Sequence, residues 1–259
     1  MDESHGSRVE AAFTKQARTF EQDDLNVAFT SGLPWLVGLV SAEAGDRVLD
    51  VAGGTGLVAR ALAPAVASVT VLDATDAMLS AGREGAAADG VDNVEFVRGD
   101  AASLPFADDS FSLVVTRFSL HHFADPAPML DEIVRVTATG GRILVKDLVA
   151  STDPGLAARQ DEIERLRDDS HVRMPVEGMV RVWLGERGCE ITRVEYHEID
   201  RPLEPWLAQS VTAQGPADAV RTLLRGEVAG GRPTGMRPHL EDGELWFQQT
   251  WEATVAVRR

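Results

Sequence analysis

The stretch Leu49–Leu62 has the residue types and spacing of a ligand-binding turn between a strand and a helix. Its first part belongs to Arg47–Val51, which is apolar and β-branched enough for a buried parallel strand, and Gly53, Gly54 and Gly56 follow. Glycines let the backbone turn sharply and approach a ligand closely. The unpaired N–H groups at the start of the following helix favour a polar or anionic ligand group. The stretch therefore predicts a site for a nucleotide-like ligand.

Two acidic residues flank this turn. Asp50 lies at the end of the first strand, before the glycines, and Asp73 follows the next predicted strand, Val69–Leu72. The glycine pattern alone also fits dinucleotide-binding turns and does not identify the ligand. A carboxylate at the end of the second strand can accept both hydroxyl groups of a ribose, and one beside the glycines suits a cationic amino-acid group better than a pyrophosphate. The two carboxylates therefore argue against NAD.

Four segments, by their order and spacing, resemble those of a known family. They read VLDVAGGTG (48–56), VLDATDAML (71–79), RGDAASLPFADDSF (98–111) and FSLHHFADPAPMLDEIVRVTATGGRILVKDL (118–148). With them the chain resembles the class I S-adenosylmethionine-dependent methyltransferases, especially the branch that includes ubiquinone and menaquinone C-methyltransferases and many small-molecule methyltransferases. The resemblance implies an enzyme that uses S-adenosylmethionine, with S-adenosylhomocysteine as product, to methylate a small organic molecule on oxygen, carbon or nitrogen.

One position departs from the family pattern. The family loop usually reads Asp-x-Gly-x-Gly-x-Gly, and Ala52 occupies the first glycine position. Alanine tolerates most backbone conformations with negative φ, so we expect a slightly reshaped loop that still binds the ligand.

The resemblance also implies which residues contact the cofactor. Asp100, which follows the predicted strand Val94–Val97, would hydrogen-bond the adenine amino group, or else only cap a turn. Met78 would pack against the adenine or belong to the core. An amphipathic N-terminal helix, Arg8–Glu21, would close over the cofactor through Phe13 and Phe20. The residues expected at the cofactor are Asp50, Gly53, Gly54, Gly56, Asp73, Ala74, Met78, Asp100, Ala101 and Arg117.

A general base is needed only if the acceptor loses a proton, and the candidates are His171, His122 and Asp147, in that order. His171 lies in a loop segment that resembles a recurrent segment of one branch of these methyltransferases, although a loop histidine is more often a surface or capping group. The adjacent histidines His121 and His122 follow the fourth strand, and either could act as a base, although the family uses this segment largely as a structural lead into the next helix. Asp147 adjoins Lys146, and a salt-bridged or solvated pair is the alternative. No metal site is expected, because no third ligand accompanies the adjacent histidines.

The alternation of strands and helices predicts an α/β fold: a Rossmann-like, seven-stranded, mostly parallel sheet with helices on both faces and an antiparallel last strand. The chain is expected to form a single domain, 1–259. Within it we expect an N-terminal helical cover (1–44), a cofactor-binding core (45–150) and an acceptor side (151–259) with an insert at about 202–243, where Trp206 is a candidate pocket wall. Strands are expected at 47–51, 69–72, 94–97, 112–116, 142–149, 190–199 and 245–257, and helices at 8–21, 34–44, 57–63, 77–88, 127–136, 153–169, 176–187 and 216–229.

Composition narrows the class of protein further. The net charge is −16, from 41 acidic and 25 basic residues, so a nucleic-acid substrate would be repelled. The single cysteine, Cys189, excludes an internal disulfide and favours a cytoplasmic location. Apolar stretches are too short to span a membrane, so no membrane partner is expected. The small-molecule acceptor is the expected partner, and the sequence leaves the oligomeric state open.

Two other functions fit parts of the sequence. The fold could bind S-adenosylmethionine without transferring its methyl group and catalyse a cyclisation or another reaction, because the motifs report cofactor binding and say little about transfer. An NAD-dependent reductase would share the glycine turn, but the sequence contains no recognisable catalytic set on the nicotinamide side. Methyl transfer remains the leading hypothesis.

Overall fold

The predicted parallel strands assemble into one sheet in the computed structural model, which describes residues 3–22, 25, 30 and 32–259. The strand order is β3-β2-β1-β4-β5-β8-β6, and the short β7 pairs with β8 as an eighth strand. Strands β1 to β5 are mutually parallel, and β8 runs antiparallel to both β5 and β6. The predicted seven-stranded arrangement with an antiparallel last strand is confirmed. The strands are β1 (Arg47–Val51), β2 (Ser68–Asp73), β3 (Val94–Arg98), β4 (Phe111–Arg117), β5 (Thr137–Leu148), β6 (Cys189–Pro202), β7 (His239–Glu241) and β8 (Glu244–Arg258).

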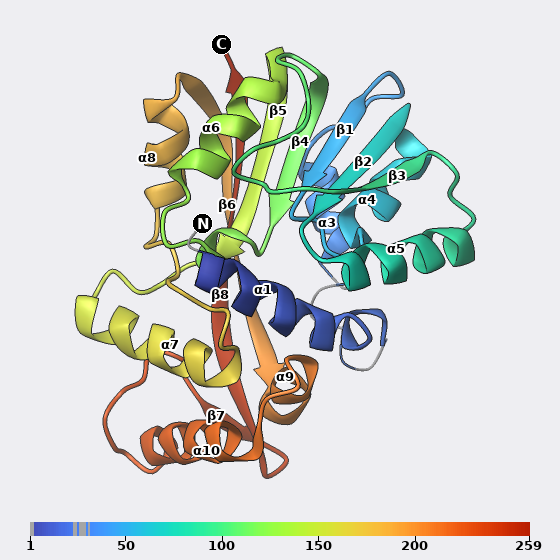
Figure 1. The fold of residues 1–259 in the computed structure, drawn as a ribbon. Helices are drawn as coiled ribbons and strands as arrows, with labels where there is room; N and C mark the ends of the chain where they lie inside the picture. The colour runs from blue at the N-terminus through green and yellow to red at the C-terminus, as the bar shows by residue number, and fades with distance from the viewer. Residues whose placement is uncertain (1–2, 23–24, 26–29, 31) are drawn as a thin grey trace.

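Helices cover both faces of the sheet because the strands bury apolar side chains on both sides (Figure 1). On one face, α6 and α8 pack against β1, β4 and β5, and on the other α3, α4 and α5 pack against β1, β2 and β4. The bounds are α3 (Leu33–Leu39), α4 (Leu57–Leu62), α5 (Asp76–Asp89), α6 (Ala127–Val136) and α8 (Met179–Glu186). Because β1 to β5 are parallel, their carboxyl ends lie at one edge of the sheet between the two helical layers.

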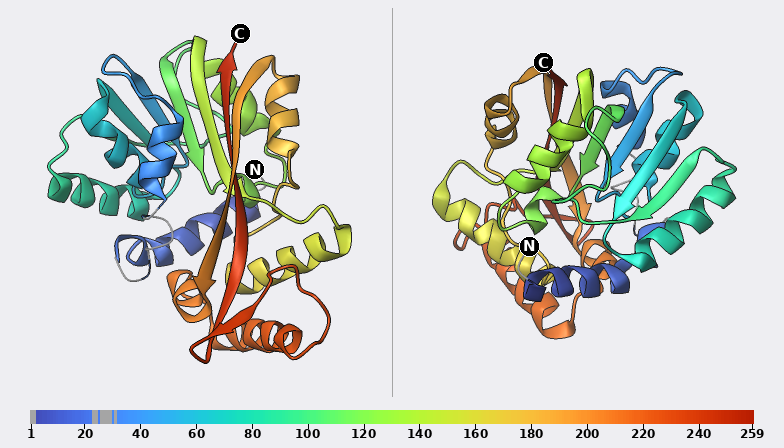
Figure 2. Two further views of the ribbon diagram at one scale, coloured as in Figure 1. Left: turned by 180° about the vertical axis from the view of Figure 1, so that it is seen from behind. Right: turned by 45° about the horizontal axis from the view of Figure 1, so that its top comes forward.

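Strands β6 and β8 continue well beyond that edge and carry a helical extension (Figure 2). The extension comprises α7 (Pro154–Arg167), α9 (Leu203–Gln209), α10 (Gln214–Val228) and β7. Its own apolar cluster joins Ile163, Trp206, Val220 and Phe247, so the insert packs jointly with α7 and β8. The first helix, α1 (Glu3–Gln16), crosses the same edge of the sheet between the extension and α5 (Figure 1).

Several boundaries differ from the predicted ones. The N-terminal helix ends at Gln16, and a separate 3₁₀ turn, Thr19–Glu21, follows it. Helix α3 ends at Leu39 instead of residue 44, and β5 begins at Thr137 instead of residue 142. Within the predicted N-terminal cover, residues 1–2, 23–24, 26–29 and 31 lie outside the described part of the chain. In that described part no helix is long and apolar enough to cross a membrane.

Lys146 and Asp147 do not pair with each other, and both are buried. The expected alternative, a salt-bridged or solvated Lys146–Asp147 pair, is therefore wrong. Neighbouring residues of a strand point to opposite faces of the sheet, so the two side chains are separated by the sheet itself. Lys146 is buried, with its Nζ atom 4.2 Å from the ring centre of Trp251, 5.0 Å from that of Phe118 and 5.2 Å from that of Trp35. Burial, with a smaller contribution from the charge of Arg117, lowers the pKa of Lys146 to about 7.

We predict that Lys146→Met stabilises the fold at pH 6. Because the folded pKa lies below the unfolded value, the lysine destabilises the folded state fully below pH 7, and this penalty disappears as the pH rises toward 10.5. The gain in unfolding free energy should be about 1–3 kcal/mol at pH 6 and shrink at alkaline pH. Urea unfolding at several pH values measures it, with exposed Lys15→Met as the matched control. A less stable Lys146→Met protein at pH 6 would mean that the contacts of the cation with the rings outweigh its burial.

Candidate active site

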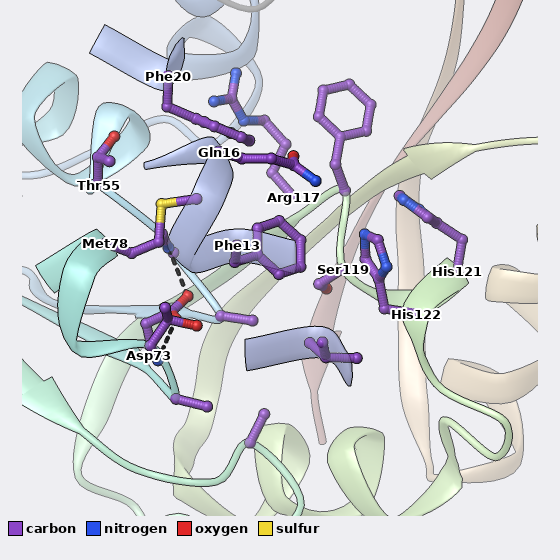
Figure 3. A pocket seen from close by; sticks show the side chains of 18 of the residues that line it. Phe13, Gln16, Phe20, Thr55, Asp73, Met78, Arg117, Ser119, His121 and His122 are labelled. Atoms are coloured by element: carbon purple, nitrogen blue, oxygen red, sulfur yellow. Dashed lines mark hydrogen bonds between the residues drawn. The ribbon is translucent and has the colours of Figure 1, made fainter. Parts of the chain in front are cut away.

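A large cavity opens at the carboxyl ends of β1, β2, β4 and β5, beneath α1 (Figure 3). It encloses about 1280 Å³ of empty space, its open mouth included. One end is formed by the glycine turn and the ends of β1 and β2, and the other by the 3₁₀ turn after β4, the end of α7 and strand β8. Ligands of open α/β sheets bind at this edge, so the cavity is the candidate active site.

The glycine turn is held rigidly by Asp73. One carboxylate oxygen of Asp73 accepts a hydrogen bond from the N–H of Gly54 at 2.9 Å, and the other accepts from the N–H of Thr75 at 2.8 Å. Burial raises the pKa of Asp73 and these N–H groups partly offset the shift. Gly54 has a φ of +59°, and a Cβ atom there would meet only Met78, at 3.9 Å, on the cavity side. The turn therefore exposes bare backbone to a ligand.

The expected negative φ of Ala52 is wrong, because the residue has a φ of +52°. Alanine here adopts the left-handed conformation that glycine would take without strain. At this position the turn therefore has a conformation that glycine adopts more readily than alanine. Ala52 still lines the cavity.

Asp50 is buried directly under the glycine turn. Its carboxylate accepts a hydrogen bond from the N–H of Ala59 at 3.2 Å, and a Cβ atom on Gly53 would come within 2.7 Å of its Cγ atom. Burial raises the pKa of Asp50 to about 7; the charge of Arg117 opposes this shift and that of Asp73 adds to it. A cationic ligand group near Asp50 would favour its ionised form.

Nine of the ten predicted cofactor residues line this cavity, and Gly56 does not. Gly56 has a structural role instead: its φ is +72°, and a Cβ atom there would press on Val71 and Phe96 at 3.0 and 3.1 Å. Phe13 and Phe20 line the cavity, as do Val9 and Gln16 on the same side. The hydroxyl of Thr55, on the glycine turn, is buried without a hydrogen-bond partner among the described residues. Polar backbone, carboxylates, apolar side chains and an unused hydroxyl together fit a nucleoside with an amino-acid part.

The histidine turn after β4 brings His121, which was considered as a base together with His122 but is not one of the three ranked candidates, to the other end of the cavity. Its Nδ1 atom donates a hydrogen bond to Oδ1 of Asp147 at 2.5 Å, and Asp147 also accepts from the N–H groups of Leu120 and Leu148. Burial lowers the pKa of His121, but the charge and hydrogen bond of Asp147, with the charges of Glu164 and Asp168, outweigh this and raise it overall. Asp147 is buried and does not line the cavity, so it acts on His121 and not on a ligand.

His122 and His171, the two predicted histidine bases, occupy different environments. His122 lines the cavity, but burial and the neighbouring His121 lower its pKa, and its Nδ1 atom contacts the carbonyl oxygen of Ser170 at 3.2 Å. His171 does not line the cavity; its Nε2 atom donates to Oδ1 of Asp161 at 2.9 Å. The position of His171 therefore does not support its predicted role.

The sequence did not predict the cavity residues that come from the extension. Arg167, Arg201, Gln249 and Trp251 line the cavity, whereas Trp206 is buried behind Arg167 and does not. One pattern in the sequence indicates Gln249: among the alternate residues of the last strand that share its face, Gln249 is polar and the others are apolar. No local pattern marks Arg167 or Arg201, since the fold brings them to the cavity over a long sequence distance.

The match to a family model includes the glycine turn and the histidine turn of this cavity. The model of the methyltransferase domain family matches residues 49–145. The uncharacterized methyltransferase YcgJ of Bacillus subtilis is 38% identical over 220 residues, which cover 83% of this chain and 83% of that protein. The ubiquinone/menaquinone biosynthesis C-methyltransferase UbiE of Dinoroseobacter shibae is 37% identical over 161 residues, but the match covers only 59% of this chain and 64% of that protein. The crystal structure of YcgJ from Bacillus subtilis has a TM-score of 0.81 at 28% identity and covers 88% of this chain and 98% of that one.

The chain belongs to the class I S-adenosylmethionine-dependent methyltransferases, and part of it is similar to the ubiquinone and menaquinone C-methyltransferases. It is an enzyme, and its cofactor is S-adenosylmethionine. The fold and the cavity described above agree with that class.

Proposed function

We propose that this methyltransferase methylates a carbon or oxygen atom of a small organic acceptor that loses a proton in the reaction, and that His121 removes this proton. The observation that carries the proposal is the 2.5 Å contact between His121 and Asp147, with the imidazole of His121 lining the cavity. A histidine oriented and made more basic by a buried carboxylate is a common general base. Acceptors that need no base, such as neutral amines, would have no use for this pair.

At the cofactor end, we propose that Asp73 binds the ribose hydroxyls and Asp100 the adenine amino group. Asp50 would lie near the cationic amino-acid group, and Met78 would pack against the adenine. When bound, S-adenosylmethionine supplies an electrophilic methyl group on a sulfonium centre. The chain itself orients the acceptor toward that group and excludes water, and both effects raise the rate of transfer.

At the acceptor end, His121 would act through its Nε2 atom. The Nδ1 atom donates to Asp147, which fixes the tautomer and leaves Nε2 to accept a proton. No hydrogen bond to Nε2 is present among the described residues. Apolar side chains of Phe118, Phe123 and Trp251 also line this region and suit an apolar acceptor body. The C-methylation named for the UbiE relative supports a ring carbon activated by a neighbouring hydroxyl.

The test of this function is a screen of hydroxylated aromatic and quinol-type compounds with S-adenosylmethionine, with products identified by mass spectrometry. Methylated product should form together with an equal amount of S-adenosylhomocysteine. Conversion of a compound without S-adenosylhomocysteine formation would contradict methyl transfer and favour the cyclase alternative.

Removal of the ribose carboxylate should weaken cofactor binding. We predict that Asp73→Asn raises the Kd for S-adenosylhomocysteine by about 10–100-fold, since charge-assisted hydrogen bonds are lost. Isothermal titration calorimetry measures this. Asp76→Asn is the matched control, because Asp76 pairs with Arg98 on the surface and does not line the cavity. An unchanged Kd in Asp73→Asn would exclude Asp73 from the cofactor site.

Loss of the proposed base should affect turnover and leave cofactor binding intact. We predict that His121→Gln lowers kcat by at least about 100-fold with a compound from the screen, while the Kd for S-adenosylhomocysteine changes less than twofold. His239→Gln, on β7 and away from the cavity, is the control. Turnover within a few-fold of wild type in His121→Gln would refute the role of His121 as base.

The pH profile separates a positioning role of Asp147 from a merely structural one. The neutral form of His121 is the active one, so wild-type kcat should fall as the pH drops through a pKa above 6.5. In Asp147→Asn the lowering effect of burial remains and the main opposing charge is gone, so this limb should move to lower pH while the plateau drops by about 10–1000-fold. A reduced plateau with an unmoved limb would show that Asp147 does not set the basicity of His121.

A further inference from the structure

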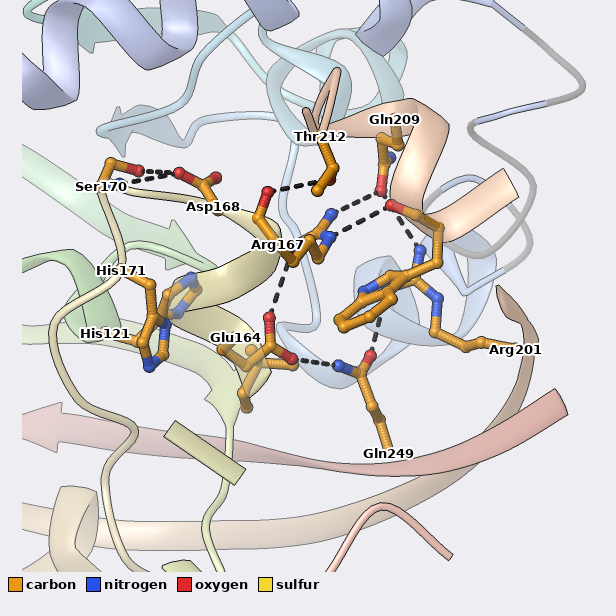
Figure 4. Close-up of polar contacts among 12 residues, drawn as sticks. His121, Glu164, Arg167, Asp168, Ser170, His171, Arg201, Gln209, Thr212 and Gln249 are labelled. Carbon is orange, nitrogen blue, oxygen red and sulfur yellow. Dashed lines mark hydrogen bonds and ion pairs between the residues drawn. The ribbon is translucent and has the colours of Figure 1, made fainter. Parts of the chain in front are cut away.

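Four buried side chains and the partly buried Arg167 close a ring of polar contacts at the acceptor end of the cavity (Figure 4). The Gln209 Oε1 atom accepts from Arg167 at 3.1 Å and from Arg201 at 3.2 Å, and Arg201 also donates to Gln249 at 3.1 Å. Gln249 donates to Glu164 at 2.7 Å, and Glu164 lies 3.5 Å from Arg167, which completes the ring. We call these five residues the arginine ring. They come from α7, β6, α9 and β8.

The arginine ring contains two guanidinium groups and one carboxylate. Burial and the charge of Arg167, opposed by the charge of Glu164, together lower the pKa of Arg201 to about 9. The next carboxylate, Asp168, also lines the cavity, but Gln16 donates to one of its oxygens at 2.8 Å and Ser170 donates to the other. The oxygens of Asp168 are therefore hydrogen-bonded to Gln16 and Ser170, and its negative charge also acts on Arg167.

Three members of the ring, Arg167, Arg201 and Gln249, line the cavity. Arg167 is fixed further by the carbonyl oxygen of Trp206, which accepts from its Nε atom at 3.1 Å, and by the Trp206 ring, 4.8 Å from its Cζ atom. A rigid guanidinium matches the geometry of a carboxylate or phosphate. Placing two of them at the wall of a cavity costs solvation energy, and an anionic ligand would offset that cost.

We propose that Arg201 and Arg167 form a subsite for an anionic oxygen group, a carboxylate or a phosphate, carried by the methyl acceptor. The inference rests on the proposed function in that it takes this end of the cavity as the acceptor end. The subsite would anchor one end of the acceptor while the atom to be methylated faces His121 and the cofactor. It would select acidic aromatic or aliphatic acceptors over their neutral analogues.

Gln209 offers a sharp test because its Nε2 atom is buried without a hydrogen-bond partner in the described part of the chain. Gln209→Glu has nearly the same shape and keeps the oxygen that accepts from both arginines. It adds a negative charge inside the arginine ring, so the variant should fold and yet no longer attract an external anion. Gln248→Glu is the matched control, because it adds the same charge on the neighbouring strand position outside the ring.

The experiment is a ligand-observed NMR titration of protein saturated with S-adenosylhomocysteine, with benzoate, phenyl phosphate and neutral benzamide as probes. Wild type and Gln248→Glu should bind at least one anionic probe about tenfold or more tightly than benzamide, and which anion binds distinguishes a carboxylate subsite from a phosphate one. In Gln209→Glu and in Arg201→Gln the anionic and neutral probes should bind within about twofold of each other.

Equal binding of all probes by wild type, or no binding of any, would overturn the proposal, as would a preference that survives in both variants of the ring. The titration requires no turnover. If the wild type prefers an anionic probe but His121→Gln keeps full activity, the subsite proposal stands and the proposed role of His121 as base fails. The two failures are therefore distinguishable.

Discussion

The buried carboxylate of Asp147 is the constraint on which the acceptor side of the cavity depends. A carboxylate with 1% exposure must have its oxygens satisfied by hydrogen bonds, and here the donors are His121 and the N–H groups of Leu120 and Leu148. These bonds hold the 3₁₀ turn after β4 over the end of β5. The carbonyl oxygen of His121 in turn accepts from Val172 and Arg173, so the loop after α7 is attached to the same turn.

The cavity joins two halves that arise in different ways. The cofactor half is local: the glycine turn, β2 and the start of α5 are neighbours in the chain, and Asp73 fixes them through short-range hydrogen bonds. The acceptor half is assembled from α7, β6, α9 and β8, which extend past the edge of the sheet. The extension is attached to the sheet through the long strands β6 and β8. Substitutions in its helices can therefore alter this half of the cavity without disturbing the glycine turn.

The local half could be predicted from sequence, and the assembled half could not. The position of Asp50, Asp73 and Asp100 at the cavity could be predicted because each stands at the end of a predicted strand, or just after one, in a recognisable motif. The left-handed conformation of Ala52 could not be predicted, because alanine rarely adopts it and the sequence gives no sign of it. The opposite orientations of Lys146 and Asp147 could have been predicted, because neighbouring side chains of a strand point to opposite faces of the sheet. The arginine ring depends on contacts between residues more than 40 positions apart, such as Arg167 with Gln209 and Arg201 with Gln249, and no pattern of period two or 3.6 reports these.

A pH titration of the imidazole nitrogens by NMR shows whether Asp147 makes His121 a base at the acceptor end. With ¹⁵N-labelled histidine and bound S-adenosylhomocysteine, the signal of His121 can be identified among the six histidines by its loss in His121→Gln. We predict a proton held at Nδ1, an Nε2 atom that titrates above pH 6.5, and a lower pKa of His121 in Asp147→Asn. A His121 imidazole that titrates below pH 6.5 in the wild type, or at the same pH in both proteins, would contradict it.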